Sequence, residues 1–221
     1  MQYFIANWKQ NFSLKEAQEW FSRFAPPSTK DQIIVATSHI HLGSITPSPQ
    51  LSLAAQFVSP YDNGAHTGQI GAQQLRGLVD YCLVGHSETR KDLQETDQLV
   101  AQKVRLLQKA NITPIVCLDL PYLESQIRVL LLELLEIKNL IFAYEPLSAI
   151  GTGQSESPQR ANEIAFKITT LAHNRSLPIL YGGSVDPFNV TDYLSQEYIS
   201  GVLVGSASLD PEEFAKIIKP S

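Results

Sequence analysis

The sequence has few cysteines and no excess of positive charge. Its 221 residues include two cysteines, Cys82 and Cys117, and each lies inside an apolar run. Buried reduced thiols in a cytoplasmic protein explain these residues better than a disulfide does. The net charge of −5 argues against nucleic acid as the main partner, although a local cluster of donors can still bind a small anion.

The sequence also lacks a membrane-spanning run and any sign of a second domain. No apolar run approaches the length that crosses a bilayer, and residues 1–8 lack the basic start and apolar core of a signal peptide. We therefore expect a cytoplasmic protein without membrane association. No linker or low-complexity tract divides the chain, and an α/β barrel of this length can form one domain, so we expect a single domain over residues 1–221.

Short apolar runs alternate with longer amphipathic segments along the whole chain. Ser13 and Glu16 form a capping box, and Ser157-Pro158 and Asp210-Pro211 place a capping side chain before a proline. The predicted helices cover residues 13–24, 92–110, 122–136, 158–173 and a last segment from 210. The predicted strands are residues 3–8, 33–37, 53–56, 81–85, 113–118, 140–144, 179–182 and 201–205.

Strands that are separated by helical crossovers pair in parallel, with right-handed connections. Eight such units can close into a barrel, which leaves no sheet edge exposed. An open doubly wound sheet is the main alternative, but the first strand lacks the GxGxxG turn of dinucleotide-binding folds. The predicted fold is therefore of the α/β class, a single (β/α)8 barrel.

The run from Ala143 to Gly153 is the most informative part of the chain. Glu145 follows a buried strand, and small residues such as Ala149 and Gly151 then supply a loop that can hinge. In a barrel, function collects at the carboxyl ends of the strands. A carboxylate in this place suits a base that works beneath a lid, whereas the alternative is an ordinary turn with a solvated glutamate.

Other strand ends carry complementary groups. Asn7 and Lys9 follow the first strand, where an extended segment would direct both to one side, and His86 follows the fourth. Gly182-Gly183 after the seventh strand exposes backbone amides. Each of these residues alone has an ordinary structural explanation. Together, a base, an imidazole, a cation and exposed amides match what enolisation of a phosphorylated carbonyl compound requires.

Five motifs resemble the triosephosphate isomerase family, whose fold is the TIM barrel. They are Asn7-Trp8-Lys9, Gly85 to Glu88, Ala143 to Gly153, Tyr181 to Val185 and Val204 to Leu209. They occur in the family's order and extend over essentially the whole chain. The resemblance implies an enzyme of glycolysis and gluconeogenesis that interconverts dihydroxyacetone phosphate and D-glyceraldehyde 3-phosphate, with no cofactor. Another sugar-phosphate isomerase and a catalytically silent phosphate-binding barrel are the alternatives.

The resemblance also implies a role for each motif residue. Glu145 would be the base, His86 a neutral electrophile, and Lys9 the cation that stabilises the enediolate; triosephosphate isomerase is itself the standard example of such a carboxylate–imidazole pair. A helix that starts just after His86 would disfavour the imidazole's cationic form. The substrate-binding residues would be Asn7, Lys9, Gly151, Ser184, Gly205 and Ser206.

The chain departs from the family's pattern at several positions. Ser206 replaces the second glycine after the eighth strand. Ser148 replaces a lid tryptophan and Leu120 its carboxylate partner, so that one contact of the closed lid is absent. Gln69 and Thr89 likewise replace a Glu–Arg pair between subunits. These changes affect the lid and the interface and leave the proposed chemistry intact.

The resemblance further implies a homodimer, because the segment Gln56–Gly71 matches a loop that each subunit inserts into its neighbour near Asn7 and Lys9. A metal site is not expected. His39 and His41 could face one side of an extended segment, but the sequence offers no third ligand, so we expect them in a solvated loop.

Overall fold

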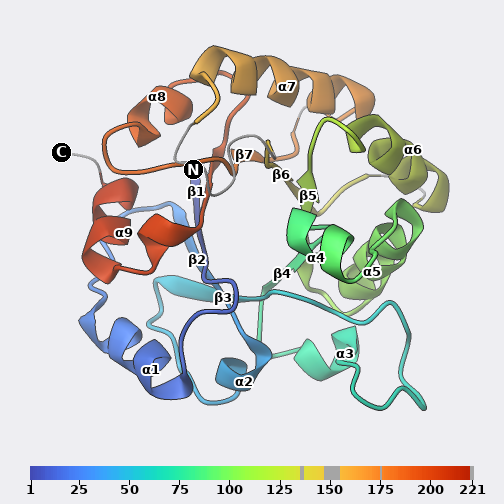
Figure 1. The fold of residues 1–221 in the computed structure, drawn as a ribbon, viewed down its shortest axis with the longest axis horizontal. Helices are drawn as coiled ribbons and strands as arrows, with labels where there is room; N and C mark the ends of the chain where they lie inside the picture. The colour runs from blue at the N-terminus through green and yellow to red at the C-terminus, as the bar shows by residue number, and fades with distance from the viewer. Residues whose placement is uncertain (135–136, 147–154, 175, 220–221) are drawn as a thin grey trace.

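The computed structural model describes residues 1–134, 137–146, 155–174 and 176–219. Eight parallel strands pair in chain order, and β1 closes the ring by pairing with β8 (Figure 1). The strands are β1 (Tyr3–Asn7), β2 (Gln32–Thr37), β3 (Leu51–Ala55), β4 (Tyr81–Val84), β5 (Thr113–Leu118), β6 (Ile141–Tyr144), β7 (Ile179–Tyr181) and β8 (Gly201–Val204). The predicted (β/α)8 barrel is confirmed.

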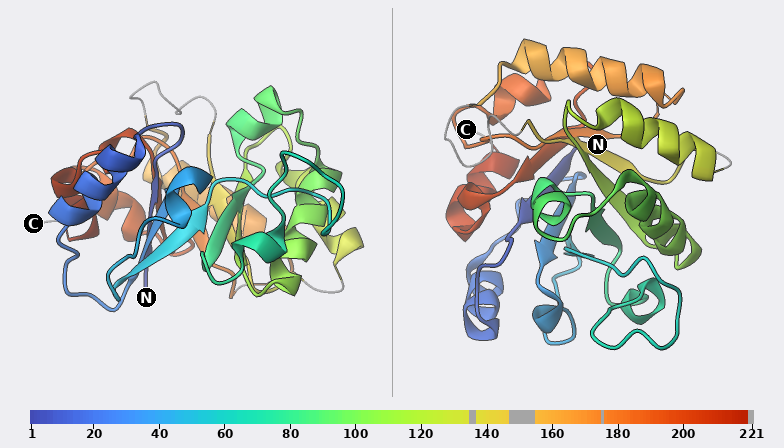
Figure 2. Two further views of the ribbon diagram at one scale, coloured as in Figure 1. Left: turned by 90° about the horizontal axis from the view of Figure 1, so that it is seen from below. Right: turned by 45° about the vertical axis from the view of Figure 1, so that its right-hand side comes forward.

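Helices surround the strands on the outside (Figure 2). They are α1 (Leu14–Arg23), α2 (His39–Leu42), α3 (Ala72–Leu75), α4 (Ser87–Asp92), α5 (Asp97–Lys109), α6 (Leu123–Glu133), α7 (Pro158–Leu171), α8 (Val190–Leu194), the short 3₁₀ helix η1 (Ser206–Ser208) and α9 (Pro211–Ile218). The predicted caps are present: Ser13 and Glu16 form a capping box, and Ser157 and Asp210 accept backbone N–H groups at the starts of α7 and α9. None of the helices in the described ranges is long and apolar enough to cross a membrane.

Two apolar layers hold the barrel together. Alternate strand residues fill its interior, among them Ile5, Ile34, Leu83 and Ile115, and the other strand faces pack against the helices. A parallel barrel is buried on both faces, which explains why the strands are continuous apolar runs rather than alternating ones. This rigid interior fixes the positions at which the strands end.

The helix predicted over residues 92–110 is wrong in its first turn. α4 ends at Asp92, Gln94 adopts a left-handed conformation with φ 54°, and Thr96 caps a new helix by accepting the Leu99 N–H. Leu93, at the start of this predicted helix, is 60% exposed. The chain turns here because a cap and a positive φ interrupt the helix.

The expectation of a solvated loop at His39 and His41 is also wrong. Both residues lie in the short helix α2, and His41 is fully buried, with its Nδ1 2.6 Å from the Thr37 hydroxyl. His39 Nε2 lies 2.8 Å from the Phe57 carbonyl oxygen. No group of three or more potential metal-ligating side chains occurs among the described residues.

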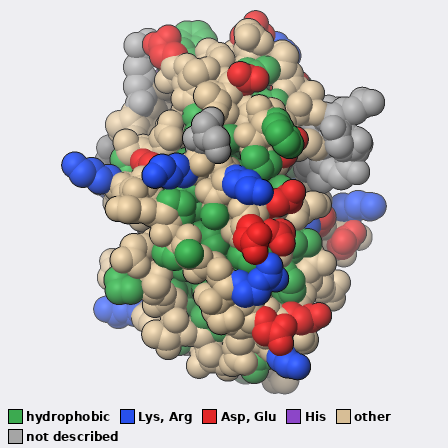
Figure 3. Space-filling view, turned by 90° about the vertical axis from the view of Figure 1, so that its left-hand side faces the viewer, with side chains coloured by type: hydrophobic (Ala, Val, Ile, Leu, Met, Phe, Trp, Pro, Cys, Tyr) green, Lys and Arg blue, Asp and Glu red, His purple; other side chains and the backbone are tan. Residues whose placement is uncertain are grey.

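The face on which α1 and α9 lie carries acidic and basic side chains intermixed, rather than gathered by sign (Figure 3). Arg23 of α1 illustrates this pattern, since its Nη2 lies 3.4 Å from Glu212 and 3.8 Å from Asp210 at the start of α9.

Candidate active site

Asn7 and Lys9 lie at the carboxyl end of β1, beside the fully buried Trp8. The expected extended spacing does not hold, because Lys9 adopts a left-handed conformation with φ 52°. Its backbone N–H donates to Asn7 Oδ1 over 3.1 Å, which closes the turn. Both side chains nevertheless line the same cavity. A non-glycine residue with this φ is uncommon, and such strain is often kept at functional sites.

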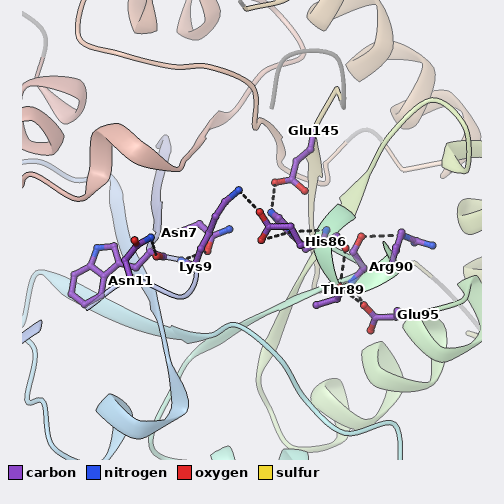
Figure 4. A network of polar contacts seen from close by, with 11 residues as sticks. Asn7, Lys9, Asn11, His86, Thr89, Arg90, Glu95 and Glu145 are labelled. Carbon is purple, nitrogen blue, oxygen red and sulfur yellow. Dashed lines mark hydrogen bonds and ion pairs between the residues drawn. The ribbon is translucent and has the colours of Figure 1, made fainter. Parts of the chain in front are cut away.

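His86 caps the start of α4, and this contact defines its tautomer. The backbone N–H of Glu88 donates to His86 Nδ1 over 3.2 Å, so Nδ1 is the acceptor and the proton of the neutral ring lies on Nε2. His86 Nε2 lies 3.2 Å from Glu145 Oε1 (Figure 4). The imidazole therefore presents an N–H to the site while its other nitrogen is held by the backbone.

Glu145 directly follows β6, and its side chain is almost completely buried. Its Oε2 atom is buried and has no hydrogen-bond partner among the described residues. Gly182 makes the room for this carboxylate, because a Cβ at position 182 would lie 2.7 Å from Glu145 Cγ. Glu145 therefore has one oxygen on His86 and one that accepts no hydrogen bond from the part of the chain that the structure describes, which suits a group that accepts a proton.

Lys9 joins this pair from the opposite side of the barrel mouth. Its Nζ lies 2.6 Å from Glu88 Oε1, and its Cε lies 3.9 Å from the position that a Cβ of Gly205 would occupy. The cation is therefore placed between the loop after β4 and the loop after β8. The sequence does not predict this position, because nothing in it pairs Lys9 with Glu88.

A cavity of about 320 Å³ connects these residues with the loops after β7 and β8. It is lined by Asn7, Lys9, Glu145, Ser184, Gly205 and Ser206, among others, so six of the predicted site residues share one wall. His86 is next to this group of residues, because its Nε2 contacts Glu145 Oε1. Gly151 and Ser148 lie outside the described residues. Leu120, which stands where the family has the carboxylate partner of the lid tryptophan, is 43% exposed.

The charges of the site shift the pKa of His86. Burial lowers this pKa, but the carboxylates of Glu145 and Glu88 raise it, and the net direction is upward. The helix that starts after His86 favours the neutral ring, but the carboxylate contact outweighs that effect in this arrangement. Burial, and then the same Glu145 carboxylate, raise the pKa of the neighbouring Cys117 thiol well above its ordinary value, so this cysteine stays protonated.

Two tyrosines hold the chain after the predicted lid. The rings of Tyr181 and Tyr193 are stacked, with centroids 4.1 Å apart. Tyr181 accepts the backbone N–H of Glu156 over 3.0 Å, and the Tyr193 hydroxyl donates to the Glu156 carbonyl. Ala149 and Gly151 of the predicted lid lie outside the described residues. Gly183 leaves room for this arrangement, since a Cβ there would overlap the Tyr181 hydroxyl.

The barrel and the site define a class, a (β/α)8 protein with a buried carboxylate and an imidazole at the carboxyl ends of its strands, where enzymes of this fold have their active sites. Residues 2–221 match the family model described as triosephosphate isomerase. The chain belongs to the triosephosphate isomerase family. Its activity is that of an aldose–ketose isomerase of triose phosphates, a reaction of glycolysis and gluconeogenesis.

Curated relatives match along nearly their whole length. A triosephosphate isomerase of Synechococcus sp. (strain JA-2-3B'a(2-13)) is 37% identical over 234 residues, which cover 96% of this chain and 94% of the relative. That of Mycoplasmoides gallisepticum is 37% identical over 244 residues, with 98% and 97% covered. That of Trichodesmium erythraeum is 36% identical over 230 residues, with 96% and 95% covered.

Proposed function

We propose that Glu145, His86 and Lys9 carry the interconversion of dihydroxyacetone phosphate and D-glyceraldehyde 3-phosphate in this chain. Glu145 removes a proton from the carbon beside the carbonyl and returns it to the adjacent carbon. His86 hydrogen-bonds the carbonyl oxygen through its Nε2–H while negative charge develops there, gives that oxygen its proton, and takes the proton of the adjacent hydroxyl as the second carbon is protonated. The 3.2 Å contact between Glu145 Oε1 and His86 Nε2 supports this assignment, because it brings the two groups to the same place.

His86 acts as a neutral donor in this proposal. The Glu145 carboxylate supplies the main upward effect on its pKa. When Glu145 contacts a substrate carbon instead, burial, the Lys9 charge and the Glu88 N–H on Nδ1 favour the neutral ring, against the upward effect of the Glu88 carboxylate on the pKa of His86. Lys9 stabilises the enediolate by its charge, and its present partner Glu88 keeps the ammonium at the mouth of the site.

We further propose that Asn7, Lys9, Ser184, Gly205 and Ser206, together with Gly151, bind the substrate. The first five share the wall of the cavity with Glu145. The loops after the seventh and eighth strands are the common phosphate site of barrel enzymes. No metal or organic cofactor is needed, since a carboxylate, an imidazole and a cation supply the base, the electrophile and the stabilising charge.

A single substitution tests the assignment of the base. Glu145→Gln keeps the side-chain shape and cannot accept the proton, so turnover should fall by about 10²–10⁴ or more. Glu212→Gln removes an exposed carboxylate of α9 and serves as the matched control, with turnover unchanged. A coupled assay of D-glyceraldehyde 3-phosphate isomerisation measures both variants, and normal turnover of Glu145→Gln would contradict the assignment.

We also propose that the enzyme is a cytoplasmic homodimer and that residues 1–221 form one domain. Cys82 and Cys117 are buried and unpaired, in keeping with a reducing compartment.

The segment Gln56–Gly71 projects between β3 and α3 beyond the ring of helices (Figure 1). Tyr61 in this segment stacks on His66 and is about half exposed, as an interface aromatic would be. Sedimentation of an active protein only as a monomer at micromolar concentration would contradict the dimer.

A further inference from the structure

The residue before His86 is held on both sides by charged side chains, a buried carboxylate and a partly buried guanidinium. The Gly85 N–H donates to Glu95 Oε2 over 3.1 Å, and the Gly85 carbonyl accepts Arg90 Nε over 2.9 Å. β4 ends at Val84, so this residue lies at the point where the chain leaves the barrel. Side chains, rather than a neighbouring strand, therefore fix the direction in which the chain enters His86.

The turn at Gly85 has little freedom to relax. Its φ of 70° is in the left-handed region, and a Cβ there would lie 3.1 Å from both Arg90 Nη2 and Val100 Cγ2. A small rotation of this residue would redirect the imidazole that follows it. The hydrogen bonds of Gly85 thus control an orientation that the proposed reaction depends on.

Glu95 is itself held by Lys103. The two side chains are almost completely buried and form an ion pair through Glu95 Oε1, while Oε2 is left for Gly85. The Lys103 ammonium also lies 3.9 Å from the centre of the Phe57 ring. A buried ion pair is weak evidence for stability, because well-packed apolar residues often replace one at no cost. What the pair does here is to aim a carboxylate oxygen at the turn.

Glu95 reaches the other side of His86 through Thr89. The Thr89 hydroxyl lies 2.6 Å from Glu95 Oε2 and 2.8 Å from the His86 carbonyl oxygen, and its single proton serves one of the two at a time. One carboxylate oxygen is therefore connected to the groups that precede and follow the imidazole (Figure 4).

We infer that Glu95, held by Lys103, is a positioning residue for His86. Glu95 fixes the Gly85 turn so that the imidazole Nε2–H points at the reacting oxygen. The inference rests on the proposed function, since it assumes that His86 takes part in the reaction. Glu95 touches no reacting atom and acts through the Gly85 turn and the Thr89 hydroxyl.

Two paired substitutions separate positioning from stability. Glu95→Leu with Lys103→Met removes both charges together and also removes the acceptor of the Gly85 N–H. Glu95→Gln with Lys103→Met removes the same charges but keeps a side-chain oxygen for that N–H. We expect the first pair to lose up to about 10²-fold in kcat with little change in KM, because small misplacements of catalytic groups have effects of this size. The second pair should keep most of its turnover.

Spectroscopy follows the imidazole directly. The ¹⁵N signals of His86, assigned with His86→Gln, should change in the first pair and stay close to those of the parent enzyme in the second. Equal turnover and equal His86 signals in the two pairs would overturn the inference. Circular dichroism and thermal unfolding confirm that each protein is folded.

A gentler substitution serves if the first pair does not fold. Thr89→Val removes the hydroxyl that joins Glu95 to the His86 carbonyl, and Thr89→Ser keeps it. We expect a lower kcat in the valine variant and recovery in the serine variant, with KM unchanged in both. Equal kcat in these two variants would also overturn the inference.

The His86→Gln background distinguishes this inference from the proposed function. If Glu95 acts through His86, the paired substitutions should slow His86→Gln by far less than they slow the parent. If His86→Gln is slow and the Glu95→Leu pair slows it by the full factor again, the positioning role is wrong and the proposed function stands. Normal turnover of His86→Gln alone would refute the proposed role of His86, and the positioning role with it.

Discussion

Gly182→Ala should slow the reaction by displacing the base. The new Cβ would lie 2.7 Å from Glu145 Cγ, whereas an ordinary contact is 3.4–4 Å, so the carboxylate has to move by at least about 0.7 Å (3.4 − 2.7). A misplacement of about 1 Å can cost about 10²-fold in rate, so we expect kcat to fall by roughly 10- to 10²-fold. The added methyl group should lower the free energy of unfolding by about 1–3 kcal/mol, the usual cost of overpacking.

The matched control is Gly43→Ala, where an added Cβ would meet no atom within 4 Å. Both variants change one glycine to alanine, and only the first touches the site. Steady-state kinetics measures kcat and KM, and thermal unfolding measures stability. Gly182→Ala with the kcat of the parent and an intact fold would refute the reasoning that Gly182 makes room for Glu145.

Three further predictions concern the charges and the held chain of the site. Lys9→Ala should raise KM and lower kcat together, because the cation acts on the bound substrate and on the enediolate; an unchanged affinity for inorganic phosphate would contradict this. Glu145→Gln should lower the pKa of His86, followed by NMR, because the carboxylate is the main upward influence on it. A raised histidine pKa contributes stability that is complete below its ordinary value of ~6.5 and is lost as the pH rises through the raised value. The melting temperature of the parent relative to Glu145→Gln should therefore fall as the pH rises from about 6 to 8. Tyr181→Phe removes the acceptor of the Glu156 N–H, a hydrogen bond worth about 0.5–1.5 kcal/mol. It should weaken binding of phosphoglycolate by about tenfold at most and increase release of methylglyoxal, and unchanged values of both would contradict this.

The parts of the fold that local rules govern are predictable from the sequence. The capping box at Ser13 and the proline that follows Ser157 mark helix starts by chemistry within a few residues, and both are present. The strands are predictable because both faces are buried, which leaves continuous apolar runs. Leu93 shows where this fails, since a positive φ two residues before a cap ends one helix and starts another inside a single apolar pattern.

The site was predictable in its residue types and less so in its geometry. Glu145, His86 and Lys9 follow strands, and the barrel brings strand ends together. The room that Gly182 provides for Glu145 depends on contact between loops after different strands, and no pattern within either loop reveals it. The Glu95–Lys103 pair is equally hidden, because two charged residues eight positions apart look solvated in a sequence.

The most direct test of the central claim is the fate of the transferred hydrogen in heavy water. If Glu145 carries a proton between adjacent carbons, the carboxyl group can exchange it for deuterium before returning it. D-Glyceraldehyde 3-phosphate formed from dihydroxyacetone phosphate in D₂O should then carry deuterium at the carbon beside its carbonyl, as read by mass spectrometry. Glu145→Gln should form labelled product at least about 10²-fold more slowly. Product formed at the full rate without any deuterium would contradict the account, since the hydrogen would then have moved without passing through an exchangeable base.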